Sequence, residues 1–250
     1  MFINVHCNQC IDISYREDKP LNFRFYKANV NENGIYNFTC DNGHKITAIS
    51  VYDKYEILFQ MGANALLDGY YFEAVGCFIA SVERFREWVI KFIWYLNGID
   101  EKACDNQWKQ MKRYSERQTG AFYALFLNQF NEIAPNFDDN KNGFRNDVMH
   151  NGTIPTEDKT YEFGEYIFNY IRSIQKTIYL KYKQETFAFS SRELNSKISK
   201  NNLSGIPRNE LVLQSSADMI LLLPYAEMRN STFDEELSHF KTYKEHPAWS

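Results

Sequence analysis

The sequence predicts a mainly helical protein: a helical bundle over residues 51–185, preceded by a small β segment over residues 1–50 and followed by a C-terminal extension over residues 186–250. Aromatic and polar residues alternate in the first segment, which is typical of strands. In the second segment apolar residues recur at steps of three and four, which is the period of an amphipathic helix. The third begins with a stretch rich in serine, asparagine and lysine, which favours a linker or loop.

The composition indicates a globular chain that does not bind nucleic acid through its overall charge. A length of 250 residues is enough for one large or two small domains with a core. The composition, 44% hydrophobic and 24% charged, is that of a globular rather than a disordered chain. The net charge is −4, so an RNA substrate would have to be bound by a local basic surface. A mixed solvated face explains the candidate residues equally well; these are Lys109, Lys112, Arg113, Arg117 and Lys141.

We expect a cytoplasmic protein without a membrane partner. The N-terminus lacks the basic region and long apolar run of a signal peptide. No uncharged apolar stretch approaches the length of a membrane span. Five cysteines, an odd number, then favour free thiols or a metal site over a disulfide framework.

Two short motifs near the N-terminus predict a zinc site. Cys7 and Cys10 form a Cys-x2-Cys motif, and Cys40 and His44 form a Cys-x3-His motif after 29 intervening residues, 11–39. Two turns that each supply two soft ligands form a tetrahedral Cys3His site, which suits a structural Zn²⁺ ion. The alternatives are a set of buried free thiols, or His6 as a competing ligand, although its adjacency to Cys7 makes this geometrically awkward.

The residues between and after these motifs are predicted to be strands. Residues 22–26 and 35–38 are aromatic and alternating, residues 31–34 form a turn between them, and residues 45–52 continue as another strand. Hairpins that are too small to bury a core and are held by a metal are typical of a zinc ribbon. A zinc ribbon can bind nucleic acid, bind a protein or cap a neighbouring domain, and the sequence leaves these roles open.

Helical periodicity predicts the elements of the bundle. The longest pattern ends near Asn97-Gly98, where asparagine and glycine favour a left-handed cap. The triplet at 118–120 is an expected interruption, and Pro135 stops the helix before it. The expected helices are residues 56–67, 72–96, 101–117, 121–133 and 161–182.

Residues 144–152, with the sequence Phe-Arg-Asn-Asp-Val-Met-His-Asn-Gly, form the stretch that indicates chemistry. Residues 138–143 are polar and turn-forming, and the stretch ends in Asn-Gly, so we expect a short helix between them. Asn146 and His150 are four residues apart and share a helical face. The long side chain of Arg145 can reach the imidazole.

These residue types suit phosphate chemistry without a metal. A guanidinium is always charged and fits a phosphate, while an imidazole can take or give a proton near neutral pH. RNA cleavage needs no metal if a base deprotonates the ribose 2′-hydroxyl and a cation stabilises the crowded phosphate. Phe144 and Val148 would hold the turn against a core. The alternative is that Arg145 is a surface cation and that His150 interacts with the C-terminal helix dipole.

The spacing Arg145-x4-His150, with Asn146 after the arginine and Ile-Pro-Thr after the glycine, resembles the Arg-x(4–6)-His motif of the HEPN (higher eukaryotes and prokaryotes nucleotide-binding) superfamily. These are all-helical domains, many of which are metal-independent ribonucleases, and this local form is similar to versions in bacterial anti-phage and toxin proteins. The resemblance implies a HEPN-like bundle with Arg145 and His150 as catalytic residues and Asn146 as a polar auxiliary. It also implies an RNA substrate, no cofactor for catalysis, a homodimer with a composite cleft, and an antitoxin or defence-system partner.

The helix predicted over residues 72–96 contributes one further candidate. Its middle, residues 81–85, resembles the first long helix of HEPN domains, and Glu83 lies on the shoulder of the apolar stripe. By this resemblance Glu83 orients the Arg-His pair or takes part in proton transfer. An intrahelical pair with a basic neighbour such as Arg86 is the alternative.

The sequence is also compatible with two other functions. A non-catalytic HEPN-like module would bind a nucleotide, RNA or a protein through the same helices. A zinc-ribbon adaptor would use the helical part only as a scaffold.

The C-terminal extension carries no recognisable motif. We expect a linker or loop over residues 190–208, a strand at 211–214, a strand or helix end at 219–223 and a short helix at 233–243. The extension could pack on the bundle, support dimerisation or bind an inhibitor.

Overall fold

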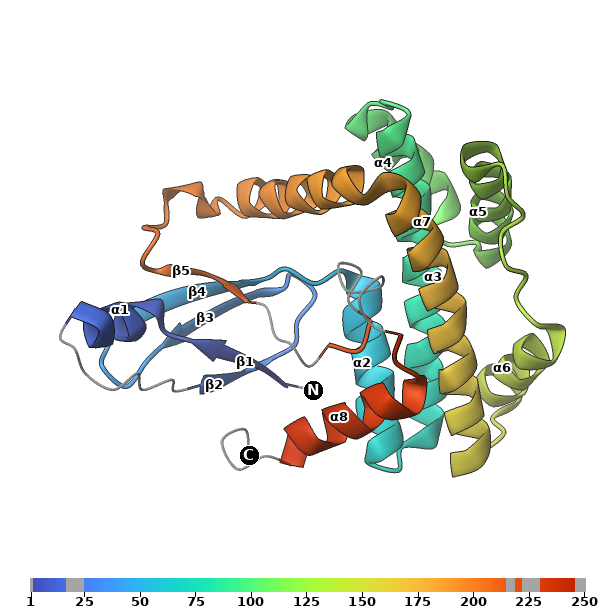
Figure 1. The fold of residues 1–250 in the computed structure, drawn as a ribbon, viewed down its shortest axis with the longest axis horizontal. Coiled ribbons are helices and arrows are strands. Elements are labelled where there is room, and N and C mark those ends of the chain that lie inside the picture. Colours follow the sequence, from blue (N-terminus) through green and yellow to red (C-terminus); the bar gives the residue numbers. More distant parts are fainter. Residues whose placement is uncertain (1, 17–24, 215–218, 222–229, 246–250) are drawn as a thin grey trace. The chain divides into compact units, whose positions relative to one another are not determined.

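The computed structural model describes residues 2–16, 25–214, 219–221 and 230–245, and its fold is mainly α with a small β segment that includes the N-terminal strands (Figure 1). The predicted fold class is thereby confirmed. The chain forms two compact units: residues 1–52, 192–218 and 242–250 make the first, and residues 53–191 and 219–241 make the second. Within the described ranges, none of the helices combines the length and apolarity that a membrane span would need.

The first unit contains two small sheets. In one, β1 (Phe2–His6) pairs antiparallel with β2 (Phe25–Asn29). In the other, β4 (Lys45–Ser50) lies between β3 (Ile35–Thr39), which is antiparallel to it, and β5 (Leu211–Gln214), which is parallel. Alternation in β4 directs Ile46 and Ala48 into a small core, where both are at most 2% exposed. The helix α1 (Asn8–Arg16) follows β1.

This unit differs from the predicted zinc ribbon in the surroundings of the first motif, in its strand pairing and in the end of one strand. The Cys7–Cys10 motif opens helix α1 rather than a hairpin. The turn at residues 31–34 is present, with Gly34 at φ +62°, but it joins strands of two different sheets. Residues 22–24 of one predicted strand lie outside the described residues, and the strand predicted over 45–52 ends at Ser50. The partner that completes the second sheet, β5, comes from the distant C-terminal part of the chain, so the local pattern did not reveal it.

The second unit is built around the long helix α3. In Figure 1, α2 lies along one side of α3, and α5 and α6 lie along the other. The apolar stripe predicted for α3 is buried: Val75, Phe78, Phe85 and Val89 are fully enclosed. The helices of this unit are α2 (Lys54–Leu67), α3 (Tyr71–Leu96), α4 (Glu101–Met111), α5 (Ser115–Phe130), α6 (Asp139–Asn151), α7 (Glu157–Lys200, up to residue 191) and α8 (Phe233–Glu245, up to residue 241).

Two glycines allow α2 and α7 to approach α3 closely. A Cβ built on Gly62 of α2 would lie 2.7 Å from one edge of the Phe78 ring. A Cβ on Gly164 of α7 would lie 2.8 Å from another part of the same ring. Phe59 and Phe233 also pack on this ring, at 5.0 and 6.5 Å between centroids. The tight packing of the unit therefore depends on the absence of a side chain at two positions.

Several predicted helix boundaries were wrong. The triplet at 118–120 does not interrupt α5, because Gln118 is buried and donates to the Lys112 carbonyl, so that it fits inside the first turns of the helix. The break lies instead at residues 112–114. The helix predicted to stop at Tyr182 is only kinked there, at φ −138° and ψ 42°.

The predicted linker at 190–208 is also wrong over its first half, because α7 continues to Lys200. Phe189, Leu194 and Ile198 keep an approximately helical apolar spacing through this polar stretch, and Phe189 is 1% exposed. A single 3-10 turn (Leu203–Gly205) follows. The predicted strand and short helix are present as β5 and α8, whereas residues 222 and 223 lie outside the described part. The C-terminal extension thus contributes to both compact units.

Candidate functional site

Helix α6 carries the Arg-His motif, and its ends are set by local sequence as predicted. Asp138 caps the N-terminus by accepting from the backbone N–H groups of Asn140 and Lys141, at 2.8 and 3.0 Å. Gly152 ends the helix in the left-handed conformation, at φ 69°. The motif therefore occupies one helix of fixed length.

The opposite face of α6 is anchored in the core of the second unit. Val148 is fully buried, and Phe144 packs on Phe163 with ring centroids 5.3 Å apart. The entry to the helix is held by the Tyr166 hydroxyl, which accepts from the Asp138 N–H at 2.7 Å. These contacts fix the rotation of α6, so its polar face has one orientation.

The four catalytic candidates converge on that polar face. The Arg145 guanidinium donates to Asn146 Oδ1 at 2.8 Å, and its Nη1 lies 3.4 Å from His150 Nε2. On α3, Glu83 Oε1 lies 3.7 Å from Arg145 Nη2. A guanidinium only donates hydrogen bonds, so Arg145 is the donor to Asn146 Oδ1 and the positive partner of Glu83. Arg145 thus links the acidic, amide and imidazole groups.

These residues line a cavity of about 790 Å³ within the second unit. Its walls come from α3, from the first three turns of α5, from residues 136–137 and from α6. Pockets that hold small ligands typically measure roughly 300–1,000 Å³, so a nucleotide fits this volume. The cavity is lined by Ile79, Val82, Glu83, Arg86, Ser115, Glu116, Gln118, Thr119, Tyr123, Asn136, Phe137, Asn142, Arg145, Asn146 and His150.

The basic residues proposed for an RNA-binding surface do not line this cavity. Lys112 and Arg113 are exposed in the connection between α4 and α5. Arg117 donates to the Gln110 carbonyl and stacks over Tyr114, 4.1 Å from its centroid. Lys141 Nζ lies 3.8 Å from Glu162 Oε2, and Lys109 Nζ donates to Asn106 Oδ1 at 3.4 Å.

Sequence reasoning did not assign Arg86, Tyr123, Asn136 or Phe137 to the site. Arg86 had a signal, because it follows Glu83 by three residues and so lies near it on the surface of the same helix. The other three come from α5 and from the segment before α6, and their position depends on how those elements pack against α3.

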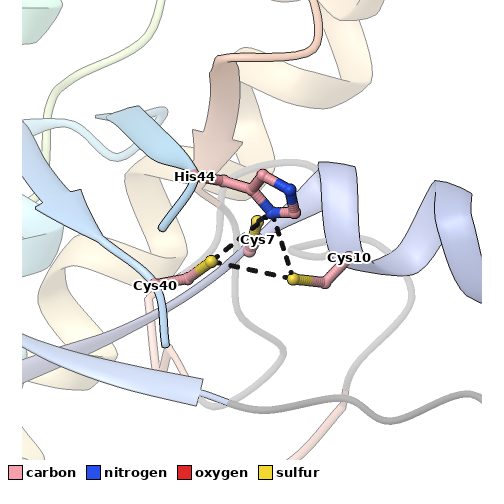
Figure 2. Close-up of side chains that lie close together, drawn as sticks. All are labelled: Cys7, Cys10, Cys40 and His44. Atoms are coloured by element: carbon pink, nitrogen blue, oxygen red, sulfur yellow. Dashed lines mark hydrogen bonds between the residues drawn. The ribbon is translucent and has the colours of Figure 1, made fainter. Parts of the chain in front are cut away.

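The four predicted zinc ligands also come together, within the first unit (Figure 2). Their ligand atoms all lie within 4.8 Å of one another. The sulfurs of Cys10 and Cys40 are 3.7 Å apart, and His44 Nδ1 is 3.4–3.6 Å from the three sulfurs. Tetrahedral zinc with bonds of about 2.3 Å to sulfur and 2.0 Å to nitrogen gives ligand separations of roughly 3.8 and 3.6 Å. The cluster can therefore hold a metal ion.

The surroundings of the cluster also suit a metal. Burial raises the pKa of the Cys7 thiol to about 12, so a positive ion is the natural partner for its thiolate. Burial acts in the same direction on Cys40, but hydrogen bonds from the backbone of His44 and Asn42 and from the side chains of Cys10 and Cys7 together lower the pKa of that thiol. The Asn42 side chain donates to Cys10 Sγ at 3.3 Å. His6 instead packs edge-on against Phe25.

Comparisons of the chain with protein-family models, curated proteins and solved structures find no match.

Proposed function

We propose that the second unit is a metal-independent RNA endonuclease of the HEPN type. The observation that supports this most strongly is the convergence of Arg145, His150, Asn146 and Glu83 in one nucleotide-sized cavity. A surface arginine and a helix-end histidine would not need to share a cavity with an acidic residue from another helix.

In the proposed reaction, the neutral His150 takes the proton of the ribose 2′-hydroxyl. The 2′-oxygen attacks the adjacent phosphorus, and the bond from phosphorus to the 5′-oxygen breaks; that oxygen takes a proton from an acid. Arg145 stabilises the charge that builds up on the phosphate oxygens. Asn146 and Glu83 hold Arg145 in place. The products are a 2′,3′-cyclic phosphate or 3′-phosphate and a 5′-hydroxyl.

The single histidine of each motif supports a homodimer, because base and acid can then come from two copies of His150 across a two-fold axis. Met149 lies within the motif and Ile154 follows it, and both are exposed, at 38% and 86%. These apolar side chains beside the site provide surface that a second copy would cover.

We further propose that the Cys3His cluster holds a structural Zn²⁺ ion and takes no part in catalysis. The cluster belongs to the first unit and the Arg-His site to the second. An RNA-cleaving activity of this kind suits a cytoplasmic toxin or anti-phage effector, restrained by an antitoxin or defence-system partner.

The test compares wild type with Arg145→Ala and His150→Ala for growth inhibition on expression and for cleavage of total RNA. We expect only the wild type to be active, with a loss of about 10²–10⁴-fold in each variant. His239→Ala is the matched control, because His239 is an exposed histidine of the same unit that does not line the cavity. The RNA ends should carry a 5′-hydroxyl.

Chelation tests whether cleavage needs an exchangeable metal ion. Brief EDTA treatment that leaves the zinc in place should not change the cleavage rate. If purified dimeric protein cuts none of several RNAs while both variants bind partners like wild type, a non-catalytic HEPN-like binding module replaces this proposal.

A further inference from the structure

A second arginine of the cavity, Arg86 on α3, has a fixed orientation. Its Nη1 donates to Thr119 Oγ1 at 3.0 Å, and its Nη2 donates to the Tyr170 hydroxyl at 3.3 Å. A guanidinium has five N–H groups, so each Nη retains one further donor. The Nε atom is buried and has no hydrogen-bond partner among the described residues. The donors that a ligand can reach are therefore the remaining N–H groups of Nη1 and Nη2, at the tip of the side chain.

Aromatic rings surround this guanidinium. Its central carbon lies 5.4 Å from the centroid of Phe137, 5.6 Å from Tyr170 and 5.8 Å from Phe122. These contacts stabilise the cation without neutralising it. They also restrict its rotamers, so that binding an anion costs little further entropy.

The charge of Arg86 is not balanced by a nearby acid. Among the residues that the structure describes, no carboxylate oxygen lies within 4.0 Å of its guanidinium. Of the two carboxylates that line the cavity, Glu83 faces Arg145 and Glu116 is exposed. A half-buried cation without a counter-ion is costly to maintain. A bound anion would offset that cost.

We propose that Arg86 is a second anion-binding residue of the cavity, and that it holds a phosphate of the RNA strand next to the phosphate that faces Arg145 and His150. This inference rests on the proposed function, because it takes its ligand from the proposed substrate. The two arginines belong to different helices of the same unit and line one cavity. A polymer with one phosphate per nucleotide offers each of the two arginines a phosphate of its own.

The experiment measures how salt affects the binding of a short single-stranded RNA with 2′-fluoro groups. This probe keeps its phosphates but lacks the 2′-hydroxyl, so the wild-type protein cannot cleave it by the proposed route. Each phosphate contact contributes roughly 0.7 to the slope of log affinity against log salt for single strands. We expect Arg86→Gln to reduce the slope by about this amount, which is a difference of about 2.6-fold between roughly 50 and 200 mM salt.

Arg84→Gln is the matched control. Arg84 lies on the same helix, pairs with Glu87 at 2.5 Å and does not itself line the cavity; its contact with the lining residue Gln118 is long, at 3.5 Å. Its removal should leave the slope unchanged. Equal slopes for wild type and Arg86→Gln, or equal reductions in both variants, would overturn the inference.

A second measurement covers the case in which Arg86→Gln does not fold. In wild-type protein labelled with ¹⁵N-arginine, the buried Nε–H of Arg86 should give a slowly exchanging signal, identified by its absence in Arg86→Lys. The signal should shift when the 2′-fluoro RNA is added. RNA binding without any shift contradicts the inference.

The outcomes separate this inference from the nuclease proposal. Cleavage of ordinary RNA with no effect of Arg86 on probe binding rejects only the role of Arg86. Probe binding that depends on Arg86, without cleavage of ordinary RNA, supports the anion site and rejects the nuclease. If wild type neither binds the probe nor cleaves RNA at low salt, both are rejected.

Discussion

The close approach of α7 to α3 can be tested by adding a single methyl group at Gly164. In Gly164→Ala the new Cβ would lie 2.8 and 2.9 Å from two atoms of the Phe78 ring and 3.1 Å from Phe233. The Phe78 ring cannot move away freely, because Gly62 of α2 approaches another edge and the side chain is fully buried. Overpacking of this kind costs about 1–3 kcal/mol. Replacing a helical glycine by alanine returns about 1 kcal/mol.

We therefore expect Gly164→Ala to lower the free energy of unfolding by about 1 kcal/mol. Gly120→Ala is the control, because Gly120 is also helical and nothing lies within 4 Å of its Cβ position. It should raise the free energy of unfolding by up to about 1 kcal/mol. Urea denaturation followed by tryptophan fluorescence reports on this unit, since Trp88 and Trp108 are buried in it. Equal stabilisation by both substitutions would refute the packing described here.

Four further predictions concern the two sites and the core. Cys40→Ser should remove the proposed zinc ion and lower the melting temperature of the first unit, whereas Cys104→Ser should do neither. Metal analysis measures the zinc content, and calorimetry measures the melting temperature. Zinc retained in Cys40→Ser would contradict the ligand assignment. If Glu83 orients Arg145, Glu83→Gln should reduce the kcat of RNA cleavage with little change in KM. A variant with the wild-type kcat and pH–rate profile would exclude that role. Met149→Asp should shift the protein towards monomer by light scattering and reduce cleavage in parallel; an active monomer would argue against a composite site. Burial raises the pKa of Tyr170 to about 12, above its ordinary value of 10.0, so this hydroxyl contributes stability that is present below pH 10 and is lost as the pH rises towards 12. Tyr170→Phe should flatten the alkaline part of the stability profile, and an unchanged profile would show that this hydroxyl does not contribute.

Local sequence was sufficient where a feature depends on neighbouring residues. Asp138 and Gly152 bound α6 because a side-chain cap and a left-handed residue act within one turn of the helix. The stripe of α3 was readable because a long amphipathic helix repeats its signal many times. Cys7, Cys10, Cys40 and His44 were recognisable because each pair lies on one short segment.

Tertiary packing decided the features that join distant segments. β5 pairs with β4 across more than a hundred residues of sequence, and no local pattern specifies that partner. The polar end of α7 is helical although its composition favours a loop, because it continues a long helix that is anchored just before this stretch by the buried Phe189.

The candidate site divides in the same way. The sequence alone identified Arg145, Asn146 and His150, because they lie within two turns of one helix and their spacing determines which side chains meet. The cavity, and the position of Arg86 in its wall, depend on how α3, α5 and α6 pack together. A cavity is the space between elements, and its shape depends on side chains that are far apart in the chain.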